Sequence, residues 1–280
     1  MKNFFTKIHN GLTFAFHDSK FGHFWSKAHL QYLVLAGLMY GFKAGLYFMI
    51  AGAMDVTKAV AFGYVNGSVA TTDTIVYSMG IDNAIPFISY FYIFYVLYYV
   101  LPEIFLWILS FYDNKKMCTI VVATMSATVI ACICFLIQQV KMVRPEDEMA
   151  MYSDFSAVHN LDTFLRWAVH LQYKADSTAM NCLPSLHATV GMAMAMIGIW
   201  TGKDEKHFPI GLRIFCGLFG FGIIMSTFFV KQHYFIDAVT GALLMAIFYF
   251  IFKWWIVPPY LKRKEAKKSA QAENVVAEQN

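Results

Sequence analysis

Residues 117–140 read MCTIVVATMSATVIACICFLIQQV, an apolar run without a single charged side chain. About 20 such residues in a helix cross the hydrocarbon core of a bilayer. Five further apolar stretches occur along the chain, over approximately 30–53, 85–111, 185–201, 209–230 and 235–256. The pattern predicts an all-α polytopic membrane protein built as a bundle of six transmembrane helices.

The composition agrees with a chain that faces lipid. Of the 280 residues, 58% are hydrophobic and only 14% are charged, whereas a soluble domain carries roughly a quarter charged residues. We expect one membrane domain over 30–257, preceded by a segment over 1–29 and followed by a basic tail over 258–280. The apolar positions of 1–29 fit either a helix lying on the membrane surface or a loosely held polar tail.

Positive charge predicts the orientation of the bundle. The short loops over 113–116 and 203–207 contain lysines, and both ends of the chain are lysine-rich. Because lysine and arginine mark the cytoplasmic side, both termini are expected there, with loops 54–84 and 141–184 outside. The basic run 262–268 fits an anchor beside anionic lipid and predicts no nucleic-acid partner. We expect a multi-pass protein of the plasma membrane.

Two short motifs place histidines where apolar stretches begin. One is Pro184-Ser185-Leu186-His187, and the other is His233-Tyr234-Phe235-Ile236-Asp237. Residues i and i+4 share a helix face, so Asp237 can bond one ring nitrogen of His233 and leave the other free as a nucleophile. Ser185 occupies a predicted N-cap position, and helix N-termini bind anions.

A cation completes the set. Arg144-Pro145 follows the third apolar stretch, on the same predicted outer side as both histidines. Arginine presents a planar fork that matches phosphate oxygens. Two histidines, an orienting acid and an arginine suit phosphoryl transfer, in which positioning and charge stabilisation dominate catalysis.

The motifs resemble those of the type 2 phosphatidic acid phosphatase superfamily, in its membrane-embedded branch, over about residues 85–256. That family has the motifs K-x6-R-P, P-S-G-H and S-R-x5-H-x3-D. The counterparts here are Arg144-Pro145, the 184–187 motif, and Ser226-Thr227 with His233 and Asp237. The P-S-L-H and H-Y-x-x-D forms are similar to the branch that contains inositol phosphorylceramide synthases.

The roles expected of these residues follow. His233, held by Asp237, attacks phosphorus and forms a phosphohistidine, and His187 protonates the leaving alkoxide and then activates water. Arg144 and Ser185 bind the substrate phosphate. No metal or other cofactor is expected.

The chain departs from the family pattern at three positions. Ile137 stands where the first motif has lysine, Leu186 replaces glycine, and Thr227 replaces arginine. Two motif cations are therefore missing or moved. Lys141 and Lys231 are the candidates to supply their charge to the substrate phosphate.

The predicted function is metal-independent hydrolysis of a lipid phosphomonoester or pyrophosphate, in phospholipid metabolism. The alternative is a lipid phosphotransferase, like an inositol phosphorylceramide synthase, that moves a phospho-headgroup to a lipid alcohol. A transporter whose histidines relay protons and a lipid-binding protein without catalysis are rivals of other classes. The oligomeric state and the lipid headgroup are not assigned.

Two further features have alternative interpretations. Lys43 and Glu103 interrupt apolar stretches at comparable depth, so they either form a structural pair, or Lys43 snorkels or lines a water-filled cavity. In the outer loop, the spacing of apolar residues predicts a helix over 159–173. This helix either guides a lipid sideways into the site or caps the bundle.

Overall fold

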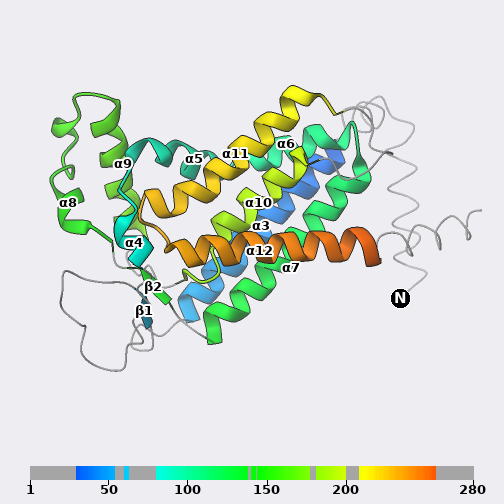
Figure 1. Cartoon of the computed structure of the whole chain (residues 1–280), viewed down its shortest axis with the longest axis horizontal. Helices are drawn as coiled ribbons and strands as arrows, with labels where there is room; N and C mark the ends of the chain where they lie inside the picture. The colour runs from blue at the N-terminus through cyan, green and yellow to red at the C-terminus, as the bar shows by residue number, and fades with distance from the viewer. Residues whose placement is uncertain are drawn as a thin grey trace, which may run out of the picture.

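The computed structural model describes residues 30–53, 60–62, 80–137, 140–142, 144–176, 181–199 and 208–256. The predicted N-terminal segment 1–29, the basic tail 258–280 and the basic loop 203–207 lie outside the described residues. The described part is mostly helical (Figure 1).

The elements follow one another in this order: α3 (Leu30–Ala53), β1 (Val60–Phe62), α4 (Gly80–Ala84), η2 (Ser89–Phe91), α5 (Tyr92–Leu97), α6 (Leu101–Ser110), α7 (Asn114–Ile137), β2 (Val140–Met142), α8 (Glu146–Ala150), η3 (Phe155–Ala157), α9 (Leu161–Ala175), α10 (Leu186–Gly198), α11 (Ile210–Phe229), α12 (Phe235–Ile251) and the π-helical turn η4 (Phe252–Ile256).

Four described helices are long and apolar enough to cross a membrane, namely α3, α7, α11 and α12 with η4. Helices α5 and α6, which meet at an angle of 46°, add a fifth if they count as one broken span. The remaining apolar stretch forms α10, which has only 13 residues. Each of the six predicted stretches is thus helical, but four or five qualify as spans by length and composition.

Large apolar side chains cover the outer faces of the long helices. Examples, with their exposed fractions, are Leu38 65%, Phe48 70%, Ile137 79%, Leu218 68%, Phe221 58% and Leu243 54%. Such an apolar surface is stable in lipid and unfavourable in water. With the spans, it makes the protein an integral membrane protein.

The break between α5 and α6 has a local cause. Pro102 lies in the first turn of α6, where its missing N–H costs no hydrogen bond, whereas a continuous helix would lose one. Glu103 follows in the same turn, where the helix dipole stabilises a carboxylate.

Lys43 and Glu103 form the structural pair that the sequence suggested. The ammonium of Lys43, on α3, lies 3.1 Å from Oε1 of Glu103, and both side chains are buried. The pair joins α3 to the first turn of α6.

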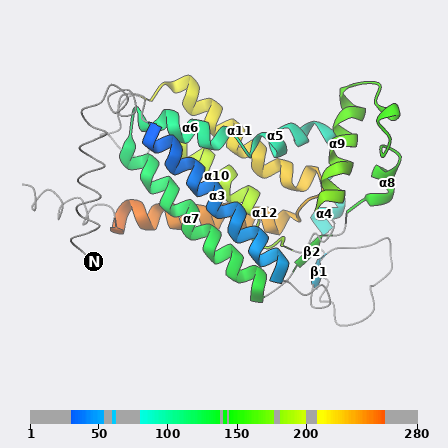
Figure 2. The same cartoon turned by 180° about the vertical axis from the view of Figure 1, so that it is seen from behind.

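Helix α10 lies at the centre of the bundle and packs against α6, α7, α11 and α12 (Figures 1 and 2). The backbone of α11 approaches that of α10 closely at glycine positions of both helices. A Cβ on Gly220 would lie 2.4 Å from the carbonyl oxygen of Gly191 and 2.5 Å from the amide nitrogen of Ala195. Small residues of this kind allow membrane helices to approach backbone to backbone.

One end of the bundle carries the non-spanning elements α4, α8, α9, β1 and β2 (Figures 1 and 2). The strands β1 and β2 pair in parallel and were not predicted, because three residues carry no alternation that a sequence pattern reveals. The predicted helix over 159–173 is confirmed as α9, which begins at a capping box made by Asn160 and Thr163.

The glycine contact gives a test of the fold. We expect Gly220→Ala to lower the free energy of unfolding by about 1–3 kcal/mol, because the added methyl group forces α10 and α11 apart. The matched control is Gly217→Ala on the same helix, since a Cβ there meets nothing within 4 Å. Thermal unfolding in detergent measures both; equal melting temperatures would contradict the close packing.

Candidate active site

His233 lies in the tight turn that joins α11 to α12. The backbone N–H groups of Gln232 and His233 donate to the carbonyl oxygen of Thr227, at 2.9 and 3.0 Å. Lys231 adopts a left-handed conformation, with φ of 53°, which lets the chain reverse direction. The turn is thus held by the last residues of α11, and it presents His233 just before α12 begins.

Two carboxylates satisfy the free N–H groups at the start of α12. Asp237 accepts from the N–H of Tyr234 at 3.0 Å, and Asp82 of α4 accepts from the N–H of Phe235 at 2.7 Å. Acids in the first turn also complement the helix dipole. Helix α4 therefore fixes the start of the helix that follows His233.

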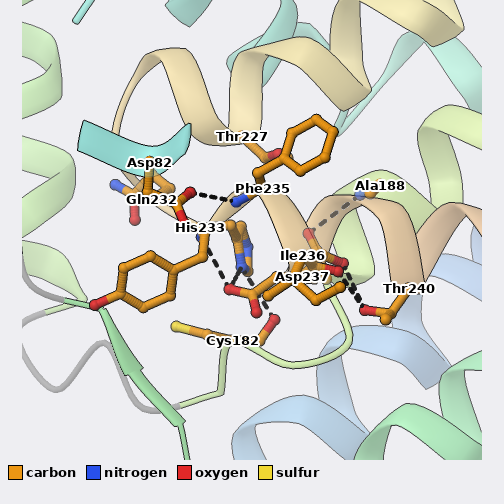
Figure 3. Close-up of polar contacts among 12 residues, drawn as sticks. Asp82, Cys182, Ala188, Thr227, Gln232, His233, Phe235, Ile236, Asp237 and Thr240 are labelled. Atoms are coloured by element: carbon orange, nitrogen blue, oxygen red, sulfur yellow. Dashed lines mark hydrogen bonds and ion pairs between the residues drawn. The ribbon is translucent and has the colours of Figure 1, made fainter. Parts of the chain in front are cut away.

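The imidazole of His233 is oriented by a carbonyl as well as by the predicted acid (Figure 3). Its Nδ1 lies 3.1 Å from the carbonyl oxygen of Cys182 and 3.6 Å from Oδ2 of Asp237. At 3.6 Å the predicted hydrogen bond from Nδ1 to Asp237 is not formed; Oδ2 of Asp237 accepts instead from the N–H of Tyr234. A carbonyl can only accept, so Nδ1 carries the proton and Nε2 is left as the basic atom.

His187 is the second residue of α10 and lines the same cavity as His233. Its ring stacks on Tyr95, with centroids 4.3 Å apart, and lies 4.3 Å from the ring of Tyr98. The centroids of the His187 and His233 rings are 5.7 Å apart. Nε2 of His187 is buried and has no hydrogen-bond partner in the structure, so it is available to a bound molecule.

The starts of α10 and α12 are joined through their backbones. The N–H of Ser185 donates to the carbonyl oxygen of Asp237 at 3.0 Å, and the hydroxyl of Thr189 lies 2.9 Å from the carbonyl oxygen of Ser185 and 3.2 Å from that of Gly241. A Cβ on Gly241 would lie 2.2 Å from the carbonyl oxygen of Ser185. Only glycine permits this approach, which sets the separation of the two histidines.

Ser185 occupies the predicted N-cap of α10. Its hydroxyl accepts from the N–H of Ala188 at 3.3 Å, and the residue is fully buried. Capping accounts for this side chain, and Ser185 is absent from the residues that line the cavity.

Arg144 is buried among acceptors of the protein itself. One terminal nitrogen lies 2.6 Å from Oδ2 of Asp176 and 2.5 Å from Oε1 of Gln232, and the other donates to the backbone carbonyl of Asp176. The guanidinium also lies 5.0 Å from the ring centroid of Tyr173. Arg144 thus holds the residue next to His233 through its terminal nitrogens, while its Nε is buried and has no hydrogen-bond partner in the structure.

Lys231, one of the two substitute cations, is bonded to the α4 region. The ammonium of Lys231 donates to the carbonyl oxygens of Asp82 and Ile85, at 3.0 and 2.5 Å, and burial lowers its pKa. It anchors α4 to the turn and is not part of the cavity wall. Lys141 lies in β2, where its backbone pairs with Ala61 of β1.

A cavity of about 410 Å³ opens between the histidines and α3. Its walls are rich in tyrosine and come from α3, the α5–α6 break, α9, α10 and the turn before α12. The lining residues are Tyr40, Lys43, Ala44, Tyr47, Phe48, Tyr95, Tyr98, Tyr99, Gln172, Ala175, Asp176, Asn181, Cys182, Leu186, His187, Gln232 and His233.

Lys43 therefore both lines the cavity and pairs with Glu103. The sequence had offered these as alternatives, and the structure shows both together. Helix α9 contributes Gln172 and Ala175 to the wall, which places it beside the cavity.

One group of possible metal ligands exists in the described residues. Ligand atoms of Cys182, His233 and Asp237 lie within 4.8 Å of one another, and all three residues are buried. Burial raises the pKa of the Cys182 thiol well above its usual value. The thiol is therefore neutral and a poor ligand unless a metal displaces its proton.

Several contributors to the site were not predicted. They are the carbonyl of Cys182, the side chains of Gln232 and Asp176, and the rings of Tyr95 and Tyr98. None of these lies at a motif position, except that Gln232 directly precedes His233. A backbone carbonyl leaves no signal in the residue type, so only the fold reveals it.

The class of protein is a helical integral membrane protein with paired histidines at one end of its bundle. The family model described as the PAP2 superfamily matches residues 78–251, more than half of the chain, and the chain belongs to this superfamily. No curated protein and no solved structure matches the chain significantly. Membership indicates an enzyme of the phosphatase or phosphotransferase type.

The glycine at the helix crossing gives a test of the site. We expect Gly241→Ala to reduce turnover at least about tenfold, because a shift of the order of 1 Å between catalytic groups costs that much or more. Gly217→Ala is the matched control, since its Cβ meets no neighbour within 4 Å. Turnover of Gly241→Ala equal to that of the control would mean that the crossing does not set the histidine geometry.

Proposed function

We propose that the protein is a lipid phosphatase, which hydrolyses a lipid phosphomonoester or pyrophosphate through a phosphohistidine on His233. The observation that carries this proposal is the pair of imidazoles from α10 and α12 in the wall of one cavity, with ring centroids 5.7 Å apart. One imidazole has a fixed tautomer, and the other has a free buried nitrogen.

In the first step, Nε2 of His233 attacks phosphorus and the bond to the lipid oxygen breaks. The imidazole of His187 gives a proton to the leaving alkoxide. The carbonyl of Cys182 and the carboxylate of Asp237 stabilise the positive charge that develops on His233.

In the second step, His187 takes a proton from water, and the resulting hydroxide attacks the phosphohistidine. The bond between phosphorus and Nε2 breaks, which releases inorganic phosphate and restores both histidines. The first-turn N–H groups of α10, whose N-cap is Ser185, can stabilise the developing negative charge. Arg144 contributes by holding Gln232 and therefore the turn that carries His233.

We also propose a topology of six spans, with both termini cytoplasmic and the site at the non-cytoplasmic face of the plasma membrane. Helix α10, with 13 residues, is too short to cross alone. It is surrounded by longer helices, and a buried helix need not match the bilayer thickness. Accessibility of introduced cysteines to an impermeant thiol reagent would test the sidedness.

Substitution of the nucleophile tests the mechanism. We expect His233→Ala to abolish phosphate release from a panel of lipid phosphates, and to abolish the acid-labile phosphoenzyme that the wild type forms in a rapid quench. His170→Ala is the matched control, because His170 is another buried histidine but does not line the cavity. Phosphate release that persists in His233→Ala would refute the assignment. Transfer to an added lipid alcohol without phosphate release would instead favour a phosphotransferase.

The proposed mechanism uses no metal, and the cluster of Cys182, His233 and Asp237 makes this testable. We expect EDTA to leave turnover of the purified enzyme unchanged within about twofold, because each step uses only groups of the protein and water. Loss of activity with EDTA, followed by recovery on adding zinc, would show that a metal takes part.

A further inference from the structure

A phosphate bound in the cavity requires a positively charged side chain nearby. The first and third motifs lack their lysine and arginine, at Ile137 and Thr227. Arg144 is engaged by Asp176 and Gln232, and Lys231 is engaged by two carbonyls of the α4 region. Neither Arg144 nor Lys231 is among the described residues that line the cavity, so a phosphate bound there needs a positive charge from another residue.

Lys43 is the one lysine or arginine among the described residues that line the cavity. It comes from α3, which lies outside the region matched by the family model. On the same face of α3, at helical spacing, Tyr40 and Tyr47 also line the cavity.

The ammonium of Lys43 is held close to the catalytic histidines. It lies 5.8 Å from the ring centroid of Tyr98, and the same ring lies 4.3 Å from that of His187. Tyr98 therefore contacts both groups, and Lys43 and His187 belong to one wall.

The bond to Glu103 leaves Lys43 able to bind a ligand. An ammonium has three N–H donors, and one of them is directed to Oε1 of Glu103 at 3.1 Å. The contact with Glu103 offsets part of the cost of burying the Lys43 side chain and fixes where its ammonium lies. Glu103 thus orients the lysine in the cavity.

We propose that Lys43 is the cation that binds the substrate phosphate, in place of the motif cations that this chain lacks. Glu103 is its positioning residue. The proposal rests on the phosphatase assignment for the identity of the substrate, and it extends the site to a helix that the family motifs do not include.

The test uses the full-length protein in detergent and the double variant Lys43→Met with Glu103→Gln. This variant removes the cation without leaving an unpaired buried carboxylate, which keeps the protein foldable. Binding of inorganic phosphate is measured by the rise in melting temperature with concentration, and KM and kcat are measured with a lipid phosphate.

We expect the double variant to bind inorganic phosphate about 10- to 100-fold more weakly, the scale of one charge-assisted hydrogen bond. KM should rise by a similar factor. Lys43→Arg should retain phosphate binding within about tenfold, because the charge remains. Lys116→Met is the matched control, since Lys116 is also buried but bonds to the carbonyl of Ile199, away from the cavity.

Phosphate affinity and KM that are unchanged in the double variant would overturn the proposal and leave the pair a purely structural link. A lower melting temperature with unchanged KM would do the same. A wild type that binds phosphate but turns over no lipid phosphate rejects the phosphatase assignment, while the loss of phosphate binding in the double variant still supports Lys43.

Discussion

The whole site depends on the crossing of α10 and α12 at their N-termini. A single backbone hydrogen bond, from Ser185 to the carbonyl of Asp237, joins the two helices, and Gly241 lets them approach closely enough to form it. His187 and His233 sit at these two helix starts, so their separation is a property of the backbone. Local contacts then orient the two rings: Tyr95 and Tyr98 pack against His187, and the backbone carbonyl of Cys182 contacts Nδ1 of His233.

A second constraint is the cost of burying charge. Arg144 and Lys43 are buried and Lys231 is partly buried, and all three are paired with oxygens of the protein, which offsets the cost of removing their charges from water. Of these three residues, only Lys43 lines the cavity. The same physical requirement therefore produces two structural anchors and one group that remains within reach of a ligand.

Much of this arrangement was predictable from the sequence. Apolar length located the six helical stretches, and helical spacing located α9, because burial in lipid or against the bundle leaves a strong periodic signal. The two histidine motifs identified residues that the structure brings together. The bend at Pro102 and the shortness of α10 were not anticipated, since an apolar run does not reveal where neighbouring helices interrupt it.

The limits of sequence reasoning are clearest for the cations. Arg144 and Lys231 stand at or near motif positions, yet their partners Gln232 and the Ile85 carbonyl are set by tertiary contacts. Lys43 lies 60 residues from Glu103, and no motif includes either residue. Depth along two antiparallel helices suggested their pairing, but only the packing of α3 reveals that the lysine also faces the cavity.

The position of Phe48 affects how a substrate would enter the cavity. It lines the cavity and is also 70% exposed, so the cavity reaches an exposed surface of α3. For the lipid phosphatase proposed above, a two-tailed substrate would place its polar end in the cavity beside this ring while its tails stay in the surrounding lipid, without extraction into water.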